Sequence, residues 1–151
     1  MRHRISAGII VEHQSRILLV RNVLPGRYDF WVAPGGGVQG EEELKVAASR
    51  EVREESGLEV APRELLYIEE LVQPDMRHCK FWFSGTLVGG KLSTAAAEAK
   101  AEYITEAAWL SQSEIQGKTV FPPVLASQYW EDRCQPTAWP KHLGLRQMEF
   151  W

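Results

Sequence analysis

The sequence has few cysteines, a small net charge and no long apolar run, and each shortage excludes a class of protein. Cys79 and Cys134 fit neither a disulfide scaffold nor a zinc-ligand spacing, so we expect reduced, packed side chains. The 17 basic and 20 acidic side chains leave a net charge of −3, which argues against a nucleic-acid-binding surface. The apolar run behind the basic start, residues 7–11, is too short for a signal peptide or a membrane span. We therefore expect a cytoplasmic protein with no nucleic-acid or membrane partner.

Length and composition indicate one domain. The chain has 151 residues, of which 44% are apolar and 25% charged, as in ordinary globular proteins. This length is enough for a core without disulfides but leaves little room for a second domain, and no repeat or linker interrupts the chain. We expect a single domain over residues 1–151, with a C-terminal tail packing on it after about residue 133.

Strand and helix signals alternate along the chain. Alternating or β-branched runs predict strands over residues 5–11, 17–21, 65–72, 79–88 and 103–110. A helix is predicted over residues 41–56, since acids lead it, arginines come late and Gly57 follows. This order favours an α/β or α+β sandwich.

The second half of the chain is less regular. Ser111 to Glu114 has capping-box spacing for a short helix, and Pro122 opens another that we expect to run through about Glu131. Residues 95–101 fit a helix, a turn or a flexible loop equally well. We expect the aromatic side chains of the tail to cover an apolar surface. These are Trp139, Phe150 and Trp151.

The negative charge is concentrated in one segment. Residues 41–59 carry seven acids and three bases, a net charge of −4, whereas the other residues sum to +1. Glu51, Glu54 and Glu55 stand at i, i+3 and i+4 of the predicted helix, within an arc of roughly 100° that also contains its apolar stripe. Like charges so placed repel one another, so a cation is expected among them.

Clustered carboxylates suit a hard divalent cation, Mg²⁺ or Mn²⁺, which commonly bridges protein oxygens to substrate phosphates. Gly36 and Gly37, just upstream, let the backbone approach a phosphate closely, which makes them candidate substrate-binding residues. Arg27 and Arg77 are further candidates for holding a phosphate. Nearby aromatics, Phe30 among them, either stack on a base or pack in the core.

Read together, these residues resemble the Nudix hydrolase signature: Gly, five residues, Glu, seven residues, then Arg-Glu-apolar-x-Glu-Glu-x-Gly-apolar. Every specified position is filled between residues 36 and 58. The matching residues are Gly36, Glu42, Arg50, Glu51, Val52, Glu54, Glu55, Gly57 and Leu58.

The resemblance implies an α/β/α sandwich with a mixed central β-sheet. It further implies that Glu51, Glu54 and Glu55 bind the divalent metal, with the carbonyl of Gly35 as an extra ligand. Arg50 would hold the catalytic helix and loop in place. The implied reaction is hydrolysis of a nucleoside diphosphate linked to another moiety, by attack of water on phosphorus.

The general base and the substrate stay open. Glu102 and Glu98 both lie where many relatives carry the base, with Glu102 slightly favoured, and in others a glutamate of the signature, here Glu54, serves instead. A nucleoside triphosphate or an ADP-ribose-type compound is the expected small-molecule substrate; the position of Pro74 resembles the ADP-ribose subgroup but also fits an ordinary turn. A non-catalytic nucleotide-binding module and an isoprenoid diphosphate isomerase are the alternatives, and a homodimer stays open.

Overall fold

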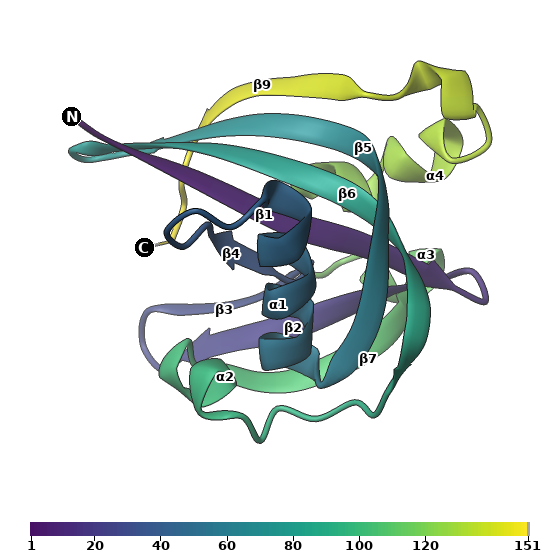
Figure 1. The fold of residues 1–151 in the computed structure, drawn as a ribbon, viewed down its shortest axis with the longest axis horizontal. Helices are drawn as coiled ribbons and strands as arrows, with labels where there is room; N and C mark the ends of the chain where they lie inside the picture. The colour runs from purple at the N-terminus through teal and green to yellow at the C-terminus, as the bar shows by residue number, and fades with distance from the viewer. Residues whose placement is uncertain (151) are drawn as a thin grey trace.

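The computed structural model describes residues 1–150, so Trp151, one of the three tail aromatics, lies outside the described residues. One mixed sheet dominates the fold (Figure 1). Its strands are β1 (Arg2–His13), β2 (Arg16–Leu24), β3 (Tyr28–Val32), β4 (Gly35–Gly37), β5 (Leu58–Gln73), β6 (Met76–Gly90), β7 (Ile104–Ser111), β8 (Val120–Phe121) and β9 (Lys141–Gln147). The helices are α1 (Leu44–Ser56), α2 (Ala97–Ala101), α3 (Gln112–Ile115) and α4 (Tyr129–Asp132), with short 3-10 turns η1 (Pro123–Ala126) and η2 (Pro136–Ala138).

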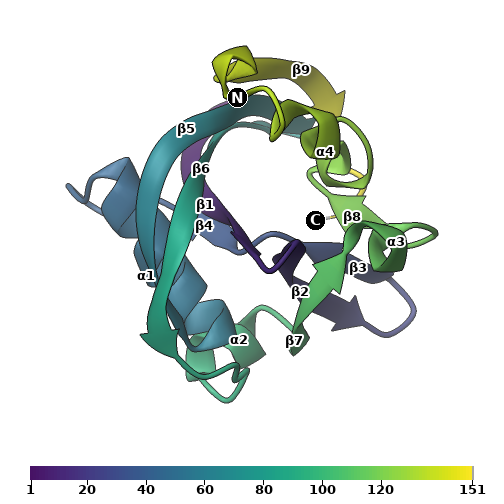
Figure 2. The same ribbon diagram turned by 90° about the vertical axis from the view of Figure 1, so that its right-hand side faces the viewer.

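The sheet curls until its two edges approach each other (Figure 2). Its order is β8-β3-β2-β1-β6-β5-β9, with β4 paired to β1 and β7 to β2. The pairs β1–β6, β3–β8 and β5–β9 are parallel and the others antiparallel. Across the opening, the Arg146 guanidinium of β9 lies 4.9 Å from the ring centre of Phe121 in β8. The predicted α+β class with a mixed sheet is confirmed.

Helix α1 packs against one face of the sheet through its small residues. Ala47, Ala48 and Val52 are fully buried in one apolar cluster with side chains of β1, β2, β5 and β6. The second cluster joins the inside of the curl to α3, η1 and α4. Gly57 ends α1 at φ +76, the left-handed conformation expected of it, and its N–H donates to the Arg53 carbonyl.

Two helix predictions need correction. Helix α1 begins at Leu44 rather than at residue 41, because Glu43 is extended and Glu42 turns back to accept a hydrogen bond from the Gln39 N–H at 2.8 Å. The helix expected from Pro122 to Glu131 is broken at Ser127, whose φ of −146 and ψ of −97 are not helical, so η1 and α4 are separate turns. In the ambiguous stretch 95–101, residues 97–101 form α2.

The strands β5 and β6 extend beyond the predicted residues. Strand β5 starts at Leu58, directly after Gly57, and its register with β6 shifts around Pro62, which lacks a ladder N–H. Pro74 lies in the tight turn between the two strands, where Asp75 has a positive φ of 62. Both cysteines are free, and no helix of the described residues is long and apolar enough to cross a membrane.

Residues after 133 return to the sheet as β9. Beside this strand, Tyr67 Oη and Lys141 Nζ each donate to the buried Asp132 carboxylate at 2.6 Å. Trp139 stacks on Tyr129 with ring centres 6.2 Å apart and meets Tyr67 edge-on. The Asp132 network therefore ties the C-terminal strand to α4 and the core.

Replacing Asp132 with asparagine should lower the free energy of unfolding by about 2 kcal/mol, since hydrogen bonds to a buried charge are lost. Burial opposes ionisation, but the bonds from Lys141, Tyr67 and Gln128 outweigh it and hold the pKa of Asp132 below its usual value. Its contribution is therefore present above about pH 3.8 and is lost as the pH falls through the lowered pKa. Urea unfolding from pH 3 to 7 measures this difference in free energy between wild type and Asp132→Asn. As a control, Glu131→Gln at the exposed neighbouring position should be as stable as wild type. A difference that is as large at pH 3 as at pH 7 would contradict the prediction.

Candidate active site

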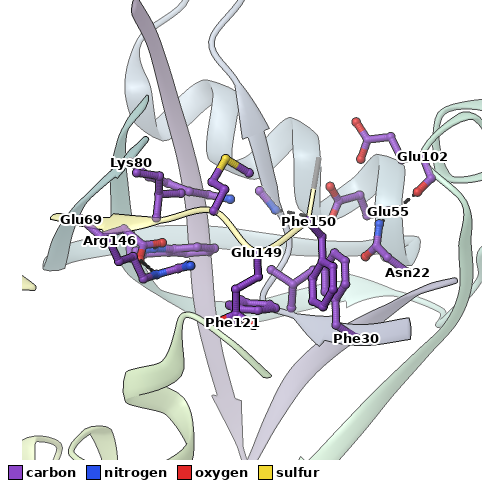
Figure 3. Close-up of a pocket in the computed structure, with 15 residues that line it drawn as sticks. Asn22, Phe30, Glu55, Glu69, Lys80, Glu102, Phe121, Arg146, Glu149 and Phe150 are labelled. Carbon is purple, nitrogen blue, oxygen red and sulfur yellow. Dashed lines mark hydrogen bonds and ion pairs between the residues drawn. The ribbon is translucent and has the colours of Figure 1, made fainter. Parts of the chain in front are cut away.

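A pocket opens on the inside of the curled sheet, between its two edges (Figure 3). Seven strands, the end of α1, Glu102 after α2 and the last described residues contribute to its wall. Its lining residues are Asn22, Phe30, Val32, Gly35, Glu55, Glu69, Leu71, Lys80, Trp82, Glu102, Phe121, Arg146, Met148, Glu149 and Phe150.

Three carboxylates meet at one end of this pocket. Glu51, Glu55 and Glu102 each place one oxygen within 4.8 Å of the others. Glu51 and Glu55 come from consecutive turns of α1 and are only 5% and 3% exposed, whereas Glu102 follows α2 and is exposed. The helix thus supplies two buried carboxylates, and a segment distant in sequence supplies the third.

The electrostatics of Glu55 are unfavourable without a cation. Burial, followed by the negative charges of Glu102 and Glu51, raises the pKa of Glu55 well above its ordinary value, and Lys80 only partly offsets this. The Gly35 N–H donates to Glu55 Oε2 at 3.3 Å. Hard oxygen donors so close together fit Mg²⁺ or Mn²⁺, whose charge would relieve the repulsion.

Arg50 connects the helix to the loop before it. Its Nη2 donates to Glu42 Oε1 at 2.6 Å and to the Gly37 carbonyl at 3.1 Å. Its Nη1 donates to Glu51 Oε1 at 2.8 Å and to Glu54 Oε2 at 3.2 Å. One guanidinium therefore fixes the position of the Glu51 carboxylate and the end of the glycine loop, the segment Gly35–Gly37 that pairs with β1 as the short strand β4.

The glycine loop is needed because side chains would collide there. A Cβ on Gly36 would lie 2.6 Å from the Glu51 carboxylate, and one on Gly37 would lie 2.8 Å from the Arg4 guanidinium. A Cβ on Gly35 would lie 2.7 Å from the Gly8 Cα of the paired strand β1. The loop packs its backbone directly against the Glu51 carboxylate and the sheet.

The remaining candidates from the sequence are dispersed. Glu54 is paired with Arg50 rather than grouped with the three carboxylates, and Glu98 is an exposed residue in the first turn of α2. Arg77 pairs with Glu70 on β5, outside the pocket lining. Arg27 lines a neighbouring hollow with Tyr28, Glu149 and Phe150.

The sequence reasoning missed several pocket residues from other strands. Asn22 donates from Nδ2 to the Glu102 carbonyl at 2.9 Å, while its buried Oδ1 has no hydrogen-bond partner among the described residues. Lys80 and Trp82 are two positions apart in the strand predicted over residues 79–88, so strand alternation puts both on one face, and this was the available signal. Nothing in the sequence showed that this face lines the same pocket as Phe121 and Arg146.

The sequence pattern that defines the NUDIX domain matches residues 2–128. The 8-oxo-dGDP phosphatase NUDT18 of Homo sapiens is 29% identical over 141 residues, which are 90% of this chain and 42% of that protein. Diphosphoinositol polyphosphate phosphohydrolase 2 of Rattus norvegicus is 44% identical over 68 residues, 44% of this chain and 35% of that protein. The chain thus spans less than half the length of either relative.

A solved structure agrees with this match. The NUDIX hydrolase from Nitrosomonas europaea superposes with a TM-score of 0.69 at 28% identity, covering 88% of this chain and 89% of that one. The fold is that of the Nudix hydrolases. The chain belongs to the Nudix family.

Proposed function

We propose that this protein is a Mg²⁺- or Mn²⁺-dependent pyrophosphohydrolase of the cytoplasm that hydrolyses a nucleoside diphosphate linked to another moiety. The substrates proposed are nucleoside di- or triphosphates and ADP-ribose-type compounds. The observation that carries the proposal is the group formed by Glu51, Glu55 and Glu102 at one end of a pocket with aromatic walls. The name of the human relative, an 8-oxo-dGDP phosphatase, supports the inclusion of nucleoside diphosphates.

Glu51 and Glu55 would hold the divalent cation, with the Gly35 carbonyl as a further ligand and the Glu102 carboxylate beside them. When bound, such a cation neutralises phosphate charge and lowers the pKa of a water. Glu102, the exposed member of the three, would accept the proton of the attacking water. The water oxygen forms a new bond to phosphorus, and the anhydride P–O bond breaks to release the leaving phosphate.

Lys80 provides positive charge within the pocket. Its ammonium nitrogen lies 4.4 Å from the ring centre of Trp82. Burial lowers the pKa of Lys80, and the negative charges of Glu69 and Glu55 oppose that shift. The Lys80 ammonium group therefore interacts with two carboxylates. An anionic phosphate entering the pocket would be attracted to this residue.

A substrate panel tests the proposed function. The protein is incubated with Mg²⁺ and nucleoside diphosphates, nucleoside triphosphates or ADP-ribose, and phosphate release is measured directly and after addition of pyrophosphatase or phosphatase. Turnover that disappears with EDTA is the expected result. Nucleotide binding without turnover of any compound, with Glu55→Gln binding like wild type, would instead favour a non-catalytic nucleotide-binding module.

The proton acceptor can be tested separately. Replacing Glu102 with glutamine should lower kcat by about 10²–10⁴-fold, the usual contribution of a general base, because an amide cannot take the proton. Mg²⁺ binding, measured by titration calorimetry, should persist through Glu51 and Glu55. Glu98→Gln is the matched control, since this exposed glutamate lies outside the three-carboxylate group, and its kcat should be that of wild type. An unchanged kcat in the Glu102 variant would remove it as the base.

A further inference from the structure

A second group of charged residues lies in the pocket, on the strands opposite Phe30 (Figure 3). Glu69 of β5 is directly across from Lys80 of β6, and Arg146 reaches the same place from β9. Glu69, Lys80 and Arg146 all line the cavity, and the alternation of strand residues puts Trp82 on the same face as Lys80. No residue of the Nudix signature belongs to this group.

Glu69 retains capacity to accept hydrogen bonds. It is 2% exposed, and its Oε1 accepts a hydrogen bond from Trp82 Nε1 at 3.0 Å. Arg146 Nε lies 3.5 Å from its Oε2, an ion-pair distance too long for a good hydrogen bond. A carboxylate offers about four acceptor positions, so Glu69 has free positions while it stays fixed by the indole.

The cations beside Glu69 retain donors. Arg146 Nε is buried and has no hydrogen-bond acceptor among the described residues, while the guanidinium stacks over Phe121. Lys80 is placed over Trp82, and its charge is felt at both Glu69 and Glu55. A ligand that enters the pocket therefore meets an acceptor, the Glu69 carboxylate, next to donors from Arg146 and Lys80.

The surrounding surfaces are flat and aromatic. Phe30 meets Phe121 edge-on at 5.3 Å and is stacked by Phe150 at 5.3 Å with 4° between the rings. Trp82 contributes a further large ring on the side of Glu69. Aromatic walls favour a planar ring system, and the charged group fits a ring whose edge carries N–H donors beside an acceptor.

Taking the proposed function as its basis, we propose that Glu69 determines base specificity and selects guanine-type bases. Such a base presents two adjacent donors, the ring N–H and the 2-amino group, which one carboxylate accepts together. It also presents a neighbouring carbonyl, which Arg146 or Lys80 satisfies. Adenine has a ring acceptor where guanine has the ring N–H, and hypoxanthine lacks the 2-amino group. With either base, the buried Glu69 carboxylate lacks one or both hydrogen-bond donors, and the cost of its burial is not offset. Binding of adenine and of hypoxanthine is therefore disfavoured.

Binding of non-hydrolysable nucleotides tests the proposal directly. The α,β-methylene diphosphates of guanosine, inosine and adenosine are titrated calorimetrically into the wild-type protein with Mg²⁺. Wild type should bind the guanosine compound at least about tenfold tighter than the inosine compound, the value of a good bidentate contact. Glu69→Gln should reduce that ratio to about twofold or less, because its amide accepts at one position only.

Matched variants separate specificity from stability. Glu70→Gln changes the next residue on β5, which pairs with Arg77 and His142 outside the pocket, and should keep the wild-type ratio. Trp82→Phe keeps an aromatic ring but removes the donor that fixes Glu69, and should give a ratio between wild type and Glu69→Gln. Because the readout is a ratio between two ligands, a loss of folded protein alone does not change it.

Equal binding of guanosine and inosine compounds by wild type, an unchanged ratio in Glu69→Gln, or no binding of any of them would overturn the proposal. Hydrolysis of the natural diphosphates is scored separately. A preference for guanosine without hydrolysis would contradict the proposed function and leave the role of Glu69 standing. Hydrolysis of the guanosine, inosine and adenosine diphosphates at one rate and with one affinity would support the proposed function and contradict the role of Glu69.

Discussion

Replacing Glu55 with glutamine should lower kcat/KM by at least about 100-fold, because the metal would lose a buried ligand and even outer contacts to a metal contribute 10–100-fold. The same change should stabilise the metal-free protein by on the order of 1 kcal/mol. Burial and the charges of Glu102 and Glu51 make ionised Glu55 costly, and glutamine removes that cost. Activity assays with Mg²⁺ and thermal unfolding with EDTA measure the two effects.

The pH dependence of this stability difference has a defined sign. Below the ordinary glutamate pKa of 4.5, Glu55 is protonated in both folded and unfolded chains, so wild type and variant should be equally stable. The difference should grow as the pH rises toward and through the raised pKa of the folded state. Mg²⁺ should raise the Tm of wild type and leave that of the variant nearly unchanged. The exposed acid Glu59→Gln is the control, and a destabilised or fully active Glu55→Gln would contradict the assignment.

Replacing Arg50 with alanine should lower the free energy of unfolding by about 3 kcal/mol, the usual cost of removing one partner of a buried ion pair. Glu42, Glu51 and Glu54 would then face one another without their shared cation. For a chain of this size, the Tm should fall by about 6–12 °C. Mg²⁺ should restore part of the loss, since it neutralises Glu51.

Two variants sharpen this test. Arg53→Ala removes an exposed arginine from the same helix and should change the Tm little, which excludes a general effect of helix charge. Arg50→Lys keeps the charge but not the planar fork that reaches four acceptors, so it should recover only part of the stability. If Arg50→Ala melted like wild type, Arg50 would not be the connection between the helix and the glycine loop.

The common face of the α1 carboxylates was predictable because a helix converts sequence spacing into direction. Residues four positions apart, such as Glu51 and Glu55, share a face whatever the rest of the chain does. The same argument placed Glu54 with them; in the structure Arg50 pairs with both Glu51 and Glu54, and Glu54 lies outside the group formed by Glu51, Glu55 and Glu102. Spacing alone does not show which carboxylates of a helix will meet a segment that is distant in sequence.

The rest of the pocket depends on strand register and on contacts between distant segments. Glu102 joins the helix glutamates from a segment that the sequence left open, because only the packed position of α2 brings it there. Arg146 reaches Glu69 through the parallel pairing of β9 with β5, which no local pattern announces. Phe150 was expected to cover an apolar surface, and it lies on Phe30 in the pocket wall.

Because the sheet is curled, the width of the pocket depends on all of its strands. Phe121 and Arg146 belong to opposite edges, so the gap between them is the sum of small twists accumulated across every intervening strand. Gly8 and Gly85 permit tight stacking along the way, since a Cβ at either would collide with Trp82 or with Val60 and Ile9. Substitutions far from the pocket can therefore change its width and with it the preferred substrate. In such a fold, more positions can alter specificity than the residues that line the pocket.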